Sequence, residues 1–244
     1  MLTEPRNADN WAKPVEAFHV AEGLEGAHKG NVEGRRPTGP LQGFGRLWQK
    51  SYQIAIPGAS PEKVISTWKD RFGEFWYPSN KFYAPAAGIA PGEVAVIAGG
   101  KGPTRLTTGV RVIYADETSW SYMTPEGHPW AAIITFSAHD TDSGAAARIH
   151  LLVRANDPLY EASFRLYTSR LEDKIWTYTL TALAAHFGSD APVEMEVTLV
   201  DRRRQWDKFG NIWKNSAVRT LLRRDRRPSP DLPQPSVPTT KNWS

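Results

Sequence analysis

The sequence predicts an α+β fold in which a curved antiparallel sheet wraps around a long C-terminal helix. Short segments of alternating hydrophobicity, separated by turn residues, run through residues 46–154, and such segments are typical of half-buried antiparallel strands. A broad apolar stripe at helical spacing then follows Asp157 and Pro158 and stops at Gly188. A single helix of this kind would cover one face of the sheet.

The first strand is expected at 48–56 and the first helix directly after it. The apolar side chains that share one parity of this strand are Trp48, Tyr52, Ile54 and Ile56. Ser60 is an N-cap residue, and Pro61 suits the first helical position. The helix therefore begins at Pro61, and Gly73 ends it.

A meander of short strands follows. The expected strands are 93–98, 105–114, 118–123, 130–138 and 145–154. Turn residues separate them, including Gly99 with Gly100 and Asp116 with Glu117. Connections of this length join neighbouring antiparallel strands.

The closing helix is expected to begin with Asp157 as its cap and Pro158 at its first position. Its apolar stripe comprises Leu159, Phe164, Tyr167, Leu171, Ile175, Tyr178 and Leu183. A helix of roughly 30 residues would be about 45 Å long and would cross the whole sheet. We expect it to bury this stripe against the concave face.

Four regions are expected: a Gly-rich arm (1–45), a ligand-binding domain (46–188), a basic extension of a strand and an amphipathic helix (189–227), and a disordered Pro-rich tail (228–244). Apolar residues in the arm, such as Trp11 and Phe18, could anchor it on the domain. The amphipathic helix is expected near 205–222, weakened by Gly210.

The composition excludes several classes of site. The chain has 244 residues and no cysteine, which rules out disulfides, thiolate metal sites and cysteine nucleophiles and fits a reducing compartment. No stretch approaches the roughly 20 apolar residues of a membrane-spanning helix. The polar residues 1–10 do not resemble a signal peptide. We therefore expect a cytoplasmic protein, with membrane association as an alternative.

The curvature of the sheet is expected to leave an apolar cavity under the closing helix. The inward parity supplies its expected ligand-binding residues, which are Tyr52, Val110, Val112, Tyr114, Trp120, Tyr122, Ile134 and Phe136. Aromatic rings provide contact area, and their polar atoms orient a small molecule. The alternative is that these side chains simply fill the core.

The order of elements from Arg46 to Phe187 resembles the START-like helix-grip (SRPBCC) superfamily, which includes polyketide cyclases and lipid-transfer domains. The segment 122–136, with Gly127, His128 and Pro129 between two strands, is similar to an uncharacterised branch of it. That branch carries acidic residues after its His-Pro pair, where this chain has Trp130-Ala131-Ala132. The resemblance implies binding of a hydrophobic small molecule or lipid, or polyketide cyclase activity.

Two residues are candidates for proton transfer. His128 lies in a turn with Glu126 nearby, and Tyr122 lies on the inward parity. The alternative reading makes His128 an ordinary turn residue and Tyr122 a core residue. No metal-ligand spacing, serine-nucleophile motif or phosphate-binding loop is present, so neither a metal nor a cofactor is predicted.

The basic extension allows more than one interpretation. Residues 202–227 contain ten Lys or Arg and two Asp, interleaved with Trp206, Phe209 and Trp213. We expect the aromatic face to dock on the protein itself, and the alternative is peripheral contact with an anionic membrane through 202–227. Nucleic acid is not an expected partner, because no recognised motif accompanies the charges. The sequence does not fix the oligomeric state.

Three functions remain open from the sequence. The first is binding of a hydrophobic small molecule or lipid, and the second is a cyclase, aromatase or isomerase-type enzyme acting on a polyketide-like substrate. The third is a non-catalytic interaction scaffold with a filled core. An apolar cavity favours the first, a cavity studded with polar groups the second and a filled core the third. The sequence establishes no reaction.

Overall fold

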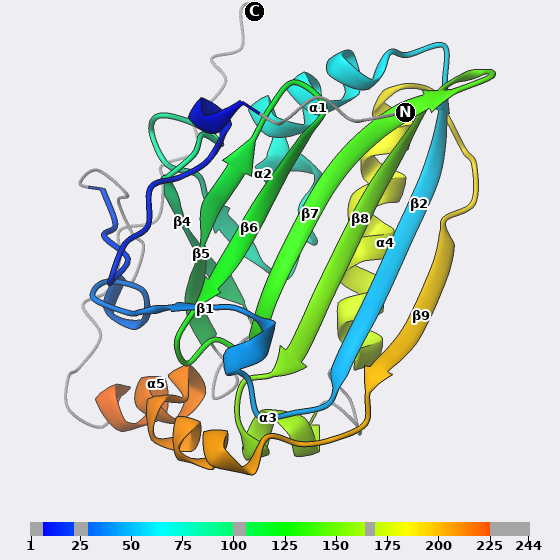
Figure 1. Ribbon diagram of the computed structural model, residues 1–244. Coiled ribbons are helices and arrows are strands. Elements are labelled where there is room, and N and C mark those ends of the chain that lie inside the picture. Colours follow the sequence, from blue (N-terminus) through cyan, green and yellow to red (C-terminus); the bar gives the residue numbers. More distant parts are fainter. Residues whose placement is uncertain (1–6, 22–28, 100–105, 164–168, 225–244) are drawn as a thin grey trace, which may run out of the picture.

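The computed structural model describes residues 7–21, 29–99, 106–163 and 169–224. Its centre is one antiparallel sheet with the strand order β3-β4-β5-β6-β7-β8-β2-β9, and β1 pairs with β6 (Figure 1). The strands are β1 (Pro37–Thr38), β2 (Leu47–Pro57), β3 (Lys81–Tyr83), β4 (Val94–Gly99), β5 (Leu106–Ala115), β6 (Ser119–Pro125), β7 (Trp130–Thr141), β8 (Gly144–Ala155) and β9 (Glu194–Asp201). The predicted α+β class is confirmed.

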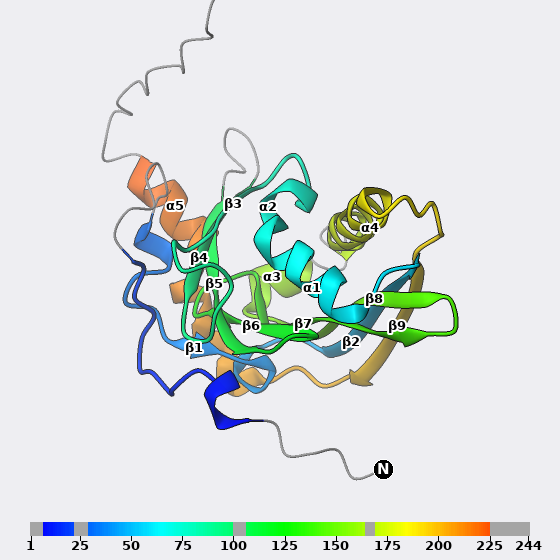
Figure 2. The ribbon, with the colours of Figure 1, turned by 90° about the horizontal axis from the view of Figure 1, so that it is seen from above.

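Helices α1 (Pro61–Asp70), α2 (Phe72–Phe75) and α4 (Ser169–His186) lie on the concave face of this sheet (Figure 2). Ser60 caps α1 as expected, because its side chain accepts a hydrogen bond from the Lys63 backbone at 3.3 Å. The inward side chains of α1, α2 and α4 meet those of β5 to β8 in one apolar core. This is the helix-grip arrangement, in which the sheet curves around a helix.

The expected single helix after Asp157 is not confirmed. The structure instead describes α3 (Pro158–Ser163) and the 18-residue α4, while Phe164 and Tyr167 lie outside the described residues. The expected stripe is only partly right, since Leu183 is buried and Leu171 and Ile175 line the cavity described below, whereas Tyr178 is 38% exposed. The side of α4 that faces the sheet carries Glu172, Trp176, Thr179, Leu180 and Leu183, all of them buried. Because Glu172 and Thr179 are polar, the apolar pattern of the sequence did not indicate this buried side.

The N-terminal arm covers the opposite, convex face of the sheet. Phe18, Val20 and Val32 form a second apolar cluster with Val94 and Val96 of β4. Gly109 of β5 is needed here, because a Cβ atom at this position would collide with Val32 and with the backbone of Ala95. The arm therefore follows the body closely at this point, although its glycines prevent long helices.

The C-terminal extension begins with β9, which pairs with β2 at the edge of the sheet. The expected amphipathic helix is wrong in its details, because the structure has a 3-10 helix, η6 (Trp206–Lys214), followed by α5 (Ser216–Arg224). Asn215 separates them: its Oδ1 accepts hydrogen bonds from the first turn of α5, and its Nδ2 donates to Asp157 at 2.8 Å. Residues 228–244 lie outside the described residues. Within the described part of the chain, no helix is long and apolar enough to span a membrane.

A candidate ligand-binding cavity

A cavity of about 680 Å³ lies between the concave face of the sheet, the segment from α2 to β3 and the N-terminal half of α4. Eight of its lining residues are aromatic: Phe72, Trp76, Tyr77, Phe82, Tyr122, Trp130, Phe136 and Trp176. Its volume and apolar wall are those of a small-molecule site. The core described above is therefore not completely filled.

Five polar atoms on residues that line this cavity are buried and have no hydrogen-bond partner among the described residues. They are Trp76 Nε1, Thr108 Oγ1, Tyr122 Oη, Glu172 Oε1 and Trp176 Nε1. Buried polar groups in native proteins are nearly always paired, and an unpaired one costs about 1–3 kcal/mol. Their concentration around one cavity therefore marks a surface that can hydrogen-bond a bound molecule.

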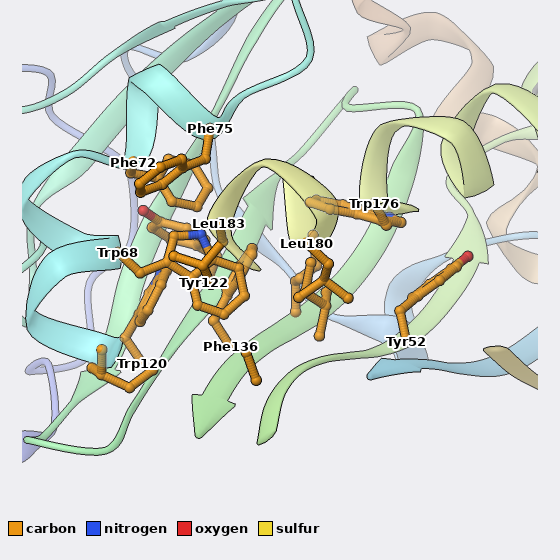
Figure 3. Packing of buried hydrophobic residues seen from close by; sticks show 14 of the residues in the cluster. Tyr52, Trp68, Phe72, Phe75, Trp120, Tyr122, Phe136, Trp176, Leu180 and Leu183 are labelled. Carbon is orange, nitrogen blue, oxygen red and sulfur yellow. The ribbon is translucent and has the colours of Figure 1, made fainter. Parts of the chain in front are cut away.

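Tyr122 reaches the cavity from the middle of β6, where its backbone pairs with Val112 and Ile134. The residue is 2% exposed, and this burial raises the pKa of the phenol, whereas a polar interaction with the Trp120 side chain lowers it. The hydroxyl therefore stays protonated and can donate one hydrogen bond and accept others. Figure 3 shows Tyr122 and Phe136 packed with Phe72 of α2.

His128 is buried, contrary to the reading of it as an ordinary exposed turn residue. His128 is 7% exposed and lines the cavity. Burial lowers the pKa of its imidazole to about 4, although a hydrogen bond to the Trp130 backbone opposes this effect. Nδ1 lies 2.9 Å from the backbone nitrogen of Trp130. Nδ1 also lies 3.0 Å from the carbonyl oxygen of Trp130, so the tautomer of the neutral ring decides whether Nδ1 accepts from the N–H or donates to the carbonyl. Glu126 does not assist His128 but forms ion pairs with Arg35 and Lys214.

The turn that carries His128 is fixed by the C-terminal extension. Gly127 has a φ of 85° and its carbonyl accepts a hydrogen bond from the Ser216 backbone at 2.9 Å. A Cβ atom at this position would collide with the backbone of Lys214. The junction between η6 and α5 therefore covers the turn from outside and keeps His128 buried.

A buried charge network that was not predicted from the sequence lies at the other side of the cavity. Lys50 Nζ lies 2.7 Å from Glu172 Oε2 and 2.8 Å from Asp173 Oδ1, and the Tyr52 hydroxyl donates to the same Asp173 oxygen at 2.6 Å. Burial alone would lower the pKa of Lys50, but the two carboxylates raise it. Burial raises the pKa of Glu172, and Lys50 opposes that effect. A lysine on the inward parity between Trp48 and Tyr52 was the available signal.

The predicted ligand-binding residues fall into three groups. Those that line the cavity are Val110, Tyr122, Ile134 and Phe136. Those that are buried in the adjoining core without lining the cavity are Tyr52, Val112 and Trp120. Trp120, for example, stacks on Phe136 with ring centres 4.6 Å apart and meets Trp68 edge-on. Aromatic packing of this kind fills the end of the core beneath α1.

Tyr114 is the exception, because it lies on the convex face. A register shift in β5 between Val112 and Tyr114 inserts one extra residue, so that Ala115 takes the inward position opposite Trp120. Such a bulge reverses the parity of every residue that follows it. Tyr114 is instead covered by Trp11 of the arm, with ring centres 4.7 Å apart, and its hydroxyl donates to Asp116. The prediction that Tyr114 lies in the cavity wall is therefore wrong.

No cluster of three or more His, Asp or Glu side chains suitable for a metal ion occurs among the residues with described positions. The polar groups of the described lining residues are two phenols, a neutral imidazole, two hydroxyls, one carboxamide, three indole N–H groups and one carboxylate. This set can hydrogen-bond and orient an organic molecule.

No family model matches the sequence. No curated protein matches it either. Several solved structures resemble it at low identity. The KanY protein (ms6282) has a TM-score of 0.45 and 13% identity over 57% of this chain and 97% of its own. Ara h 8.0201 has a TM-score of 0.42 and 12% identity over 58% of this chain and 99% of its own. The di-domain ARO/CYC StfQ from the steffimycin biosynthetic pathway has a TM-score of 0.40 and 10% identity over 57% of this chain and 50% of its own.

Proposed function

We propose that this protein binds a hydrophobic small molecule or lipid in the cavity between its sheet and α4. The observation that carries the proposal is the combination of an aromatic wall with five unpartnered polar atoms around a cavity of about 680 Å³. The apolar wall would bury the body of the ligand, and the polar atoms would fix its orientation. Tyr122 is the central contact, because its hydroxyl can donate to a ligand oxygen.

Binding is favoured over a cyclase or isomerase-type reaction at Tyr122 and His128. A general acid or base works best when its pKa lies near the working pH. Burial moves the pKa of the Tyr122 phenol upward and that of the His128 imidazole downward, in both cases away from neutrality. These two residues are therefore suited to hold a ligand rather than to exchange protons with it. The cavity also argues against a scaffold with a filled core.

The experiment is native mass spectrometry of the purified protein, followed by titration with a fluorescent apolar probe. We expect either a co-purifying small molecule or saturable binding of one probe molecule per chain. If a co-purified molecule is extracted and added back, it should displace the probe. A protein that carries no ligand and binds no apolar probe would contradict the proposal.

A second function, contact with an anionic membrane, is proposed for the C-terminal extension. Four apolar side chains in and near η6 are exposed: Leu41, Trp206, Phe209 and Trp213, at 71%, 68%, 48% and 84%. We call them the apolar patch. Phe44 lies below the apolar patch, with its ring centre 5.3 Å from that of Trp206, so the aromatic face docks only partly on the domain. Residues 202–219 add six Lys or Arg and one Asp. Exposed aromatic and basic side chains together suit the surface of an anionic bilayer.

Vesicle co-sedimentation tests this second proposal. The protein should bind phosphatidylcholine vesicles that contain phosphatidylserine and should bind pure phosphatidylcholine vesicles less. Replacing Trp213 by Ala should weaken binding without changing the melting temperature, because its side chain is 84% exposed. Equal binding by wild type and variant, or no binding to either vesicle, would contradict it.

A further inference from the structure

The charges around the cavity are one-sided. Among the described lining residues there is no Lys or Arg, and Glu172 is the only carboxylate. The one other ionisable group that could become positive, His128, is held neutral because burial lowers its pKa to about 4. The lasting charge at the wall of the described cavity is therefore negative.

One carboxylate oxygen of Glu172 accepts a hydrogen bond, and the other has no partner among the described residues. Oε2 lies 2.7 Å from Lys50 Nζ, whereas Oε1 is buried and has no partner among the described residues. Trp176 lies beside the carboxyl group without forming a hydrogen bond of good geometry. The side chain of Glu172 is only 3% exposed, so bulk water does not solvate Oε1. A buried carboxylate oxygen in this position would be stabilised by a positively charged donor.

Lys50 does not neutralise the whole network. Its single ammonium also lies 2.8 Å from Asp173 Oδ1, so two carboxylates share one cation. Lys50 does not line the cavity. Glu172 therefore shares this ammonium with Asp173, and of the two carboxylates only Glu172 lines the cavity.

The wall next to Glu172 is aromatic in a way that also favours a cation. Trp176 is four residues further along α4, which places it on the same face as Glu172. The ring of Trp76 meets that of Trp176 edge-on with centres 5.6 Å apart, and both residues line the cavity. Indole faces attract cations through their negative π-surface. A carboxylate with neighbouring indole rings is thus complementary to an ammonium group.

We propose that the ligand of this cavity is an amphiphilic amine, whose apolar body lies against the aromatic wall and whose ammonium group donates to Glu172 Oε1. The proposal rests on the proposed binding function and specifies the chemical class of the ligand. An amphiphile with a carboxylate head would meet Glu172 and no cationic side chain of the described wall.

The test uses three probes that share one apolar body: 2-naphthylmethylamine, 2-naphthalenemethanol and 2-naphthoate, which are cationic, neutral and anionic at pH 7. Their dissociation constants for the wild-type protein are measured by calorimetry. We expect the amine to bind about tenfold more tightly than the alcohol, because a charge-assisted hydrogen bond replaces a neutral one. The carboxylate should bind most weakly.

Two variants assign the effect to its residue. Glu172→Gln should remove the advantage of the amine and leave the affinity for the alcohol within about twofold. Asp173→Asn is the matched control, because it removes the same charge from the same network but from a residue that does not line the cavity. It should reduce the preference for the amine less than Glu172→Gln does, because the carboxylate oxygen that accepts from the ammonium group remains. An equal loss in both variants would overturn the assignment to Glu172.

The wild-type comparison stands even if Glu172→Gln does not fold. If the alcohol binds but the amine binds no more tightly, or if the carboxylate binds best, the amine proposal fails while the binding function stands. If no probe binds, both proposals fail.

Discussion

Lys50 and Glu172 form a buried ion pair, with Nζ 2.7 Å from Oε2, although 122 residues separate them in the sequence. The pair connects the middle of β2 to the N-terminal half of α4 at the edge of the cavity. Asp173 and Tyr52 complete the network. The position of α4 over the sheet, and therefore the shape of the cavity, depends on these contacts.

Removing the cation from this network should be strongly destabilising. Lys50→Met leaves two carboxylates without their shared ammonium, and breaking a buried pair in this way costs about 3–5 kcal/mol. The free energy of unfolding in denaturant measures the loss. The double variant Lys50→Met/Glu172→Leu also removes the most buried carboxylate and should be more stable than the single variant. A double variant that is less stable than Lys50→Met would contradict this account.

His128 should make the fold sensitive to acid. Its pKa is lowered from 6.5 to about 4 in the folded protein, chiefly by burial, so below pH 6.5 the unfolded chain binds the proton first. Stability should therefore fall between about pH 6.5 and pH 4, by up to about 3 kcal/mol from this group. The measurement is denaturant unfolding at several pH values in this window. His128→Asn, which keeps an acceptor for the Trp130 backbone, should flatten that part of the profile, and an unchanged slope would exclude His128 as its source.

The hydroxyl groups of Tyr122 and Tyr52 should respond differently to the same change. Tyr122 Oη has no partner among the described residues, so Tyr122→Phe should leave stability unchanged or slightly higher and weaken a polar-headed ligand by about 1 kcal/mol. The Tyr52 hydroxyl donates to Asp173 at 2.6 Å. Tyr52→Phe should therefore lower stability by about 1–2 kcal/mol and leave binding of an uncharged probe unchanged. Equal effects of the two variants would show that the Tyr122 hydroxyl is not available to a ligand.

Much of the strand pattern could be predicted from alternation alone. Val110, Tyr122, Ile134 and Phe136 are four of the expected wall residues, and all four line the cavity. The bulge before Tyr114 could not be foreseen, because residues 112–115 are all apolar or aromatic and give no alternation to break. The parity of Tyr114 was consequently assigned to the wrong face.

The charged part of the site depends on contacts that no local pattern contains. Glu172 and Lys50 do not stand out in the sequence, because each is one charged residue among many, and their burial follows only from their pairing across the fold. His128 lies in a segment with turn residues, and its burial depends on the backbone of Lys214 and Ser216 far along the chain. The sheet-facing side of α4 was only partly predicted for the same reason, since Glu172 and Thr179 are among its buried residues.

The inward face of β5 borders open space at Val110 and packed core at Val112. Val110 and Val112 share the inward face and are 2% and 1% exposed, but only Val110 lines the cavity. Val110→Phe should place its ring in the cavity, change stability by less than about 1 kcal/mol and displace an apolar fluorescent probe. Val112→Phe should overpack the core and cost about 1–3 kcal/mol.

Probe affinity and the free energy of unfolding, measured on these two variants, therefore distinguish an open ligand-binding cavity from a filled core. If the cavity is open, Val110→Phe should lose binding of the probe and keep its stability, whereas Val112→Phe should lose stability. Equal destabilisation of both variants, with no probe bound by the wild-type protein, would show that the core is filled at both positions and would contradict ligand binding in this cavity.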